Sequence, residues 1–419
     1  MPSLPRASGT VLGDRDFRLL WAGQTASQFG AQAGQVVLPL VAVLTLDAST
    51  GLLGALRAVE QAPILLFSLF AGAWVDRRRA RDVMVLSDVG RLLALSAVAL
   101  AHPLGVLGLP VLFAVAFMVG VLGVFFDVAY QACLVRLVER EQLARGNSVL
   151  EGSRSAAQTG GPALGGALLS FLTAPFATLA SASFFTLSAL WIARIRRDDS
   201  DAPPTPPERA PGIWRRIHEG LGFVVGHRVL RAVGLASAVF QFSFAALMTV
   251  YLLFLPRALH LSGAAVGAAL AATGPGAVVG SLLAARLPGR LGHGRVLVTA
   301  AVLADGVLLC VPALHGATPV TVCLLMAVNF AFGAFGQLVN VTLMAVRQAV
   351  TPLLLQGRVV ATINFAGMGL TPLGSLLGGF LAGALGLRHG LLVTAVGLAL
   401  SPVCMVLSPL GRLGRQLPG

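Results

Sequence analysis

Long apolar runs separated by short polar breaks dominate this chain of 419 residues. An α-helix needs about 20 mostly apolar residues to cross a bilayer, and each run has about that length. The pattern therefore predicts an all-α membrane protein with twelve transmembrane helices. The predicted helices cover residues 17–46, 52–75, 83–101, 110–134, 148–172, 175–195, 230–255, 264–287, 296–313, 319–346, 359–385 and 390–407.

Prolines and glycines inside these runs predict irregular helices. We expect the first helix to be tilted or broken near Pro39 and the fifth to kink at Gly161-Pro162. The sequence Gly274-Pro275-Gly276 is expected to break the helix predicted over 264–287.

The composition excludes a soluble domain. Only 11% of the residues are charged and 56% are hydrophobic, with a mean hydropathy of +0.84, whereas soluble domains carry about 25% charged residues. The net charge of +13 does not indicate nucleic-acid binding, because the basic residues are spread between apolar runs instead of forming one patch. The four cysteines have neither metal-site nor disulfide spacing.

Arginines are distributed unevenly over the two sets of connecting loops. About twenty-five of them lie in the N-terminal segment, the C-terminal tail and the loops that follow every second helix, which is the bias that marks cytoplasmic loops. The opposite loops hold Arg257 and Arg388. This asymmetry predicts that both termini are cytoplasmic and that the number of crossings is even.

The chain divides near its middle. A polar linker with five prolines covers residues 196–212, and an amphipathic stretch over 213–229 is expected on the membrane surface. Segments around Pro162 and Pro372 repeat at half the chain length. We therefore expect two pseudo-symmetric six-helix bundles with a binding site between them at the midplane. The predicted parts are an N-terminal bundle (1–195), a linker with an amphipathic helix (196–229), a C-terminal bundle (230–407) and a cytoplasmic tail (408–419).

The turn from Gly72 to Arg81 carries five charges within six residues, so it must lie at a membrane face. Its pattern resembles the Gly-x-x-x-Asp-Arg-x-Gly-Arg-Arg/Lys loop between helices 2 and 3 of major facilitator superfamily transporters. Gly72, Asp76, Arg77 and Arg81 match that loop, whereas Arg79 and Ala80 depart from it. The resemblance implies the fold of that superfamily and a conformational latch at this turn. The alternative is that these charges only anchor the topology.

Three further segments resemble the bacterial exporter branch that includes siderophore and macrolide efflux proteins. They are residues 16–24, 126–132 and 161–166. In the last segment Gly161, Pro162, Gly165 and Gly166 resemble the end of the motif associated with antiporters, although Ala157 replaces an upstream glycine. The resemblance implies a multi-pass protein of the bacterial cell membrane that exchanges a substrate for protons.

Glu60 is the first candidate for proton coupling. It lies inside a predicted helix, where a charge is expensive and is usually paired, neutral or functional. Arg57 lies three residues earlier on the same face. Glu60 therefore either binds protons or a cationic substrate, or forms a static pair with Arg57. Asp305 and Asp127 are the further candidates.

Asp88, Arg91, Asp127 and Arg154 form a second group of charges inside predicted helices. All four are expected toward the cytoplasmic side. We favour a structural network of opposite charges over contact with substrate, because the group lies away from the midplane.

Uncharged polar residues are candidates for the wall of a substrate cavity, or for hydrogen bonds between helices. Four glutamines follow one face of the first helix at spacings of three to four residues. The second half has comparable amides and an aromatic residue. The full set is Gln24, Gln28, Gln32, Gln35, Gln241, Tyr251, Asn329, Gln337, Asn340 and Asn364.

No enzyme motif is present in the sequence. The phosphate-binding Gly-x-x-x-x-Gly-Lys loop of ATP-driven pumps is missing, and the histidines are scattered singly, so we expect no cofactor and no metal site.

We therefore predict a monomeric, proton-coupled antiporter, surrounded by membrane lipids, that exports a small amphipathic or hydrophobic compound by alternating access. Such activity would give multidrug resistance. One alternative is uptake or export of a polar metabolite. Another is a non-transporting protein, such as a lipid scramblase or a receptor, that uses the same fold.

Overall fold

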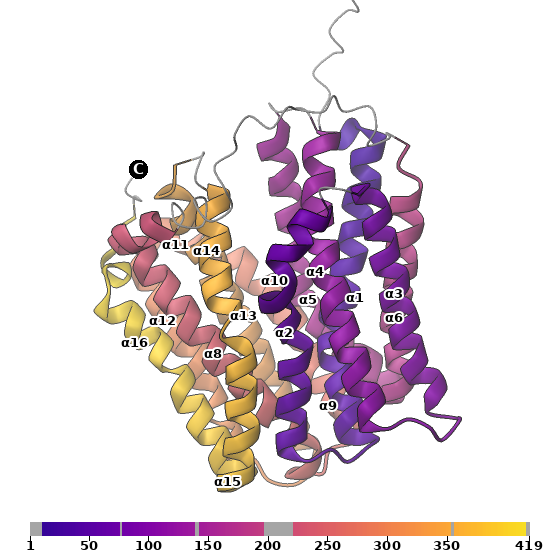
Figure 1. Cartoon of the computed structure of the whole chain (residues 1–419). Helices are drawn as coiled ribbons and strands as arrows, with labels where there is room; N and C mark the ends of the chain where they lie inside the picture. Colours follow the sequence, from indigo (N-terminus) through magenta and orange to yellow (C-terminus); the bar gives the residue numbers. More distant parts are fainter. Residues whose placement is uncertain (1–10, 76–77, 139–141, 197–220, 353–355, 416–419) are drawn as a thin grey trace, which may run out of the picture.

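The computed structural model describes residues 11–75, 78–138, 142–196, 221–352 and 356–415, and the secondary structure in these ranges is helical. The first half contains six long helices (Figure 1). They are α1 (Arg15–Leu44), α2 (Thr50–Val75), α3 (Ala80–Ala101), α4 (Leu109–Leu137), α5 (Leu143–Phe171) and α6 (Ala174–Ala193).

The second half has more numerous and shorter helices. They are α8 (Arg228–Arg257), α9 (Gly263–Ala271), α10 (Thr273–Ala284), α11 (Leu287–Leu291), α12 (His293–Leu308), α13 (Pro319–Ala349), α14 (Gln356–Met368), α15 (Thr371–Leu398) and α16 (Leu400–Leu407). Short 3-10 helices cover Val11–Gly13, Val311–Ala313 and Pro409–Arg412. Most of the predicted linker, residues 197–220, lies outside the described residues, whereas 221–226 are helical.

Capping residues, glycines and prolines explain some of the helix ends. The Asp14 carboxylate accepts hydrogen bonds from the backbone N–H groups of Asp16 and Phe17 and so caps α1. The predicted break before Gly274 is confirmed, because α9 ends at Ala271 and α10 starts at Thr273. Of the two alternatives predicted at Pro39, the break is absent, since α1 continues through it, and the tilt stays a prediction. The helix α5 also continues across Pro162, and the kink predicted there stays a prediction.

The last helical segment turns within the connection predicted at residues 386–389. The backbone of Gly386 has φ of 78° within α15, so the helical path reverses at that residue. Glycine tolerates this left-handed region because it has no Cβ.

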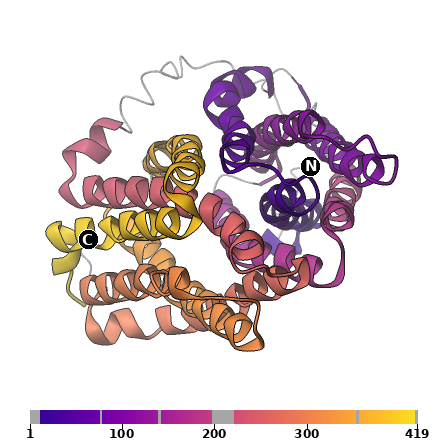
Figure 2. The same ribbon diagram turned by 90° about the horizontal axis from the view of Figure 1, so that it is seen from below.

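Each half packs mainly within itself. In the first half α1 packs against α5 and α6, and α3 packs against α4 and α6. In the second half α8 packs against α15 and α14, and α13 packs against α10 and α12. Viewed along the helices, the two groups lie side by side (Figure 2).

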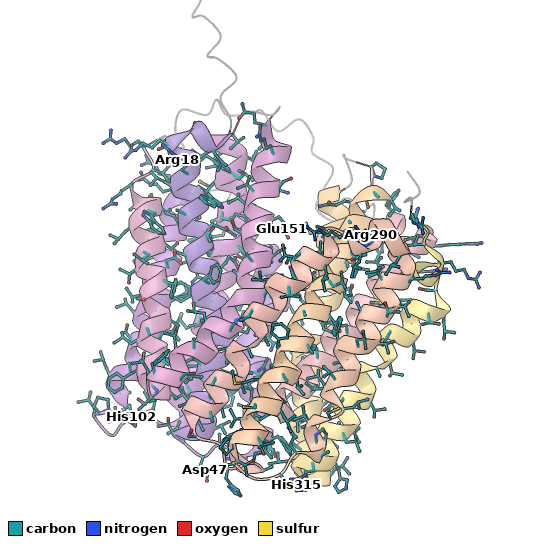
Figure 3. The ribbon with its side chains drawn as sticks, turned by 180° about the vertical axis from the view of Figure 1, so that it is seen from behind. Arg18, Asp47, His102, Glu151, Arg290 and His315 are labelled. Atoms are coloured by element: carbon teal, nitrogen blue, oxygen red, sulfur yellow. The ribbon has the colours of Figure 1, made fainter. Side chains whose placement is uncertain are left out.

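The two ends of the molecule differ in charge. Arg18 and Arg290 lie at one end, here called the basic end, whereas Asp47, His102 and His315 lie at the other, here called the Asp47 end (Figure 3). The helix α1 begins at the basic end, and the 3-10 helix Pro409–Arg412 lies there as well.

The halves approach each other most closely toward the Asp47 end. There α2 packs against α15 and α5 against α9. A Cβ on Gly54 of α2 would lie 2.7 Å from the carbonyl oxygen of Ser375, and a Cβ on Gly166 of α5 would overlap the backbone of Gly267. Because only glycine permits such contact, these positions form two close seams between the halves. Toward the basic end the helices of the two halves diverge (Figure 1).

The outer surface suits a lipid environment. Within the described residues, nine helical stretches are long and apolar enough to cross a membrane. Many large apolar side chains on them are exposed, including Leu93, Leu282 and Phe380. Such a surface would aggregate in water.

Candidate functional site

Glu60 is the eleventh residue of α2 (Thr50–Val75), which places it about 15 Å along the helix from the Asp47 end. It therefore lies near mid-height of α2. Arg57 is the charge that acts most strongly on it, but the two are not among the described ion pairs. Gly120 of α4 lies so close that a Cβ would overlap the Glu60 carbonyl oxygen. Close packing thus fixes the backbone of Glu60 while its carboxyl group has no described ionic partner.

Asp88 and Arg91 form a buried ion pair within α3, 2.5 Å apart. The Ser27 hydroxyl of α1 donates to Asp88 at 3.0 Å and accepts from Arg91 at 2.9 Å. The Arg91 guanidinium lies 4.7 Å from the ring centre of Phe126 and 4.4 Å from that of Phe185. This cluster joins α1, α3, α4 and α6 and suits a structural role, because each charge is compensated.

Asp127 and Arg154 belong to a second cluster. The Gln28 amide of α1 donates to the Asp127 carboxylate of α4 at 3.0 Å. Arg154 of α5 interacts with the charges of Asp127 and Glu151 and hydrogen-bonds to Tyr130. The four charges that the sequence grouped together therefore lie in two clusters, of which this one reaches toward the second half through Glu151 (Figure 3).

The four glutamines of α1 have different surroundings. Gln24 is fully buried, and its amide has no hydrogen-bond partner among the described residues. Gln28 binds Asp127, whereas Gln32 packs against Gly161 of α5. Gln35 is exposed. They do not form one uniform polar wall, because α1 contacts several helices in turn.

The polar candidates of the second half also separate into groups. The Asn329 amide donates to the Tyr251 hydroxyl at 2.7 Å, and both residues are buried in the core. Gln337 accepts a hydrogen bond of 2.9 Å from Thr159 of the first half, and the amide of the exposed Asn340 lies 3.5 Å from it. Gln241 packs beside Gly367. The side chain of Asn364 lies outside the described residues.

Asp305 lies in α12 with 2% of its surface exposed. No described ion pair or side-chain hydrogen bond involves it. A buried carboxyl group without a counter-charge favours its neutral form, since burial disfavours the charged one.

The predicted latch is described only in part. Asp76 and Arg77 lie outside the described residues, and Gly72 is part of α2. Arg81 donates to the Ile195 carbonyl at 3.0 Å, next to the end of α6, and pairs with Asp82 at 3.2 Å. Arg81 thus ties the turn between α2 and α3 to α6.

The glycines of the helix-5 motif allow α5 to pack closely on both sides. Gly161 and Gly165 face Gln32 and Ala33 of α1, whereas Gly166 faces Gly267 of α9 in the other half. Pro162 lies between them within a continuous helix.

Two charged contacts between the halves were not predicted from the sequence. The Arg257 guanidinium of α8 donates to the Asp47 carboxylate at 2.5 Å and to the Ala48 carbonyl at 2.6 Å. Near the other end, Glu151 of α5 acts electrostatically on Arg347 of α13. One sequence feature could have indicated the first contact. Arginine is scarce in the set of loops that holds Arg257, so this isolated cation suggested a specific partner.

Comparison with known proteins agrees with this arrangement. Residues 9–416 match the family described as transmembrane secretion effector, of the major facilitator superfamily. The chain is 30% identical over 379 residues to the multidrug efflux pump Tap of Mycobacterium tuberculosis, covering 86% of this chain and 85% of that protein. It is 29% identical over 362 residues to the multidrug efflux pump Tap of Mycolicibacterium fortuitum, covering 83% and 84%.

Solved structures with low sequence identity share the fold. A bacterial homologue of the lysosomal transporter Spinster, inward-facing and occupied, aligns with a TM-score of 0.67 at 15% identity, covering 95% of this chain and 97% of that one. The nucleoside transporter NupG aligns with a TM-score of 0.68 at 12% identity, covering 93% and 99%. The chain is therefore a multi-pass membrane protein that belongs to the transmembrane secretion effector family of the major facilitator superfamily, a family of transporters and not of enzymes.

Proposed function

We propose that this protein is a proton-coupled antiporter that exports small amphipathic or hydrophobic compounds across the bacterial cell membrane by alternating access, as a monomer. Its similarity to multidrug efflux pumps supports the direction and the substrate class. The observation that carries the mechanism is Glu60, a carboxyl group near mid-height of the bundle with no described ionic partner.

Twelve crossings are the most economical count. The apolar stretch Phe365–Leu407 is 43 residues long and turns at Gly386, so it suffices for two crossings of about 20 residues each. Together with α2 and α5, the apolar stretches then give twelve. Both described ends of the chain lie at the basic end, which the arginine bias assigns to the cytoplasm. We propose that the two bundles are residues 1–195 and 230–407, joined by the linker 196–229 and followed by the tail 408–419.

The contacts between the halves support a state closed toward the Asp47 end. The Asp47–Arg257 pair and the two glycine seams hold that end together. Glu151 and Arg347, one from each half, carry opposite charges that interact electrostatically nearer the basic end. In alternating access, the contacts at the Asp47 end separate while Glu151 and Arg347 approach each other. The turn with Gly72, Asp76, Arg77 and Arg81 then acts as a latch on the cytoplasmic side.

The coupling of proton binding to the conformational change follows from the free-energy cost of burying a charge. Protonation of Glu60 removes the desolvation penalty of its carboxylate, so it shifts the balance between the two states. Asp127 is a weaker candidate, because its carboxylate already accepts a hydrogen bond from Gln28 and interacts with the charge of Arg154. Asp305 is buried and has no ionic partner among the described residues, but its helix α12 packs within the second half, away from the seams.

The test is transport of ethidium, a fluorescent amphipathic cation, in proteoliposomes with an imposed pH gradient. We expect Glu60→Gln to lower proton-driven flux by about tenfold or more, whereas Glu60→Asp keeps a titratable group and retains most of the flux. Undiminished flux in Glu60→Gln would remove Glu60 from the mechanism. Thermal stabilisation by polar metabolites without ethidium flux would favour a metabolite transporter. Lipid flipping without any solute flux would favour a scramblase.

A further inference from the structure

A groove between α1 and α6 on the surface of the first half is not part of the proposed transport path. It encloses about 280 Å³, which is near the lower end for ligand pockets. Trp21 and Leu187 at its edge are exposed, so it opens to the outside of the bundle. The lining residues are Trp21, Ala22, Thr25, Ala26, Phe29, Phe184, Leu187 and Trp191.

The surface that lines the groove is almost wholly apolar. The Thr25 hydroxyl donates to the Trp21 carbonyl of its own helix at 2.6 Å. The Trp21 indole N–H donates to the Ser153 hydroxyl of α5, also at 2.6 Å. Because these donors are engaged, the groove resembles the apolar cavities that stay dry and accept hydrocarbon.

Arginines stand at the basic end of both walls. Arg18 lies three residues before Trp21 on α1, and Arg194 lies three residues after Trp191 as the C-cap of α6. Residues three apart share a helix face, so each wall runs from arginine to tryptophan to apolar residues. Both arginines are exposed, and Arg18 lies at the basic end (Figure 3). Tryptophan prefers the boundary between headgroups and hydrocarbon, which sets the two arginines at the level of the headgroups.

We propose that this groove binds an anionic phospholipid of the leaflet at the basic end. One acyl chain lies along the groove between α1 and α6, and the headgroup phosphate contacts Arg18 and Arg194. Charge complementarity selects an anionic lipid over a neutral one. Since α1 also packs against α5, the lipid would brace the helix that carries the four glutamines.

The experiment compares retention of phosphatidylglycerol and phosphatidylcholine with identical acyl chains on the purified full chain, measured by native mass spectrometry. We expect preferential retention of phosphatidylglycerol. The double variant Arg18→Gln/Arg194→Gln should raise the half-saturating phosphatidylglycerol concentration by about tenfold and abolish the preference. Arg18→Lys/Arg194→Lys should retain the preference. Ala22→Phe, which fills the groove, should weaken retention of both lipids.

The matched control is Arg290→Gln/Arg295→Gln, which removes two exposed arginines from the second half. It should leave the preference for phosphatidylglycerol unchanged. Equal retention of the two lipids by the unmodified protein would overturn the proposal, as would an equal loss of the preference in the control. Displacement of both lipids by ethidium would assign the groove to substrate and would likewise overturn it.

Discussion

The buried polar groups of the first half differ in kind from those of the second. The first half buries an ion pair, Asp88–Arg91, that is completed by the Ser27 hydroxyl. The second half buries a neutral hydrogen bond between Tyr251 and Asn329, and a carboxyl group, Asp305, with no described ionic partner. The two halves thus have a similar arrangement of helices, but their buried polar groups differ in charge. Of the buried groups just described, charged ones join helices in the first half and neutral ones do so in the second.

The largest expected effect is that of Arg91→Met. This change leaves the Asp88 carboxylate buried and uncompensated, which should lower the free energy of unfolding by about 3–5 kcal/mol. The double variant Asp88→Asn/Arg91→Met should recover most of the loss, because neither charge remains. Thermal unfolding in detergent measures both. If the single variant were as stable as the unmodified protein, the ion pair would not join the helices of the first half.

Asp88→Asn should lower the stability of the protein, whereas Asp305→Asn should not. Asp88→Asn leaves Arg91 without its carboxylate and should cost about 1–3 kcal/mol. Asp305→Asn removes a carboxyl group with no described counter-charge, so its stability should stay the same or rise. The two variants can be compared in one unfolding series. A destabilised Asp305→Asn variant would mean that the second half also depends on a charge.

Two tyrosines allow the comparison at a single hydroxyl group. Tyr130→Phe removes a hydrogen bond to the charged Arg154 and should cost about 1.5–3 kcal/mol. Tyr251→Phe removes a bond to Asn329, which still donates to the Leu325 carbonyl at 2.8 Å, and should cost about 0.6 kcal/mol. Unfolding in detergent again gives both values. Equal costs would contradict a difference in kind between the halves.

The smallest effect concerns the pair that joins the halves. The Asp47 side chain is 92% exposed, so Asp47→Asn should shift the conformational balance by about 1 kcal/mol or less. Spin labels at Leu52→Cys and Leu385→Cys, in a background without the native cysteines, report the separation of α2 and α15. We expect a modest increase in the population with longer distances. An unchanged distance distribution would contradict this prediction. It would mean that the glycine seams, and not the Asp47–Arg257 pair, close the Asp47 end.

Apolar length was enough to predict the helices, because a bilayer leaves the backbone no other partner than its own helix. The irregularities were harder to predict. Gly274-Pro275-Gly276 marked the division between α9 and α10, yet Pro39 and Pro162 left their helices continuous. In a packed bundle, neighbouring helices can compensate for the hydrogen bond that proline removes.

The candidate site was less predictable than the fold. Spacing along one helix brings Asp88 next to Arg91, but the rotation of α1 decides that Ser27 joins them while Gln24 has no described partner. Asp47 and Arg257 are 210 residues apart, and they meet only because the halves dock. Contacts that depend on docking leave no periodic trace in a sequence.

Gly386 has a mechanical consequence for the second half. The chain reverses at the single residue Gly386, and Arg388 donates hydrogen bonds to the Pro312 and Leu314 carbonyls. The two helical segments before and after Gly386 are therefore joined without a flexible loop. The segment that begins at Thr371 also contains Ser375 and Gly379, which contact α2. When this segment moves away from α2, the segment that follows Gly386 must move with it as one rigid body.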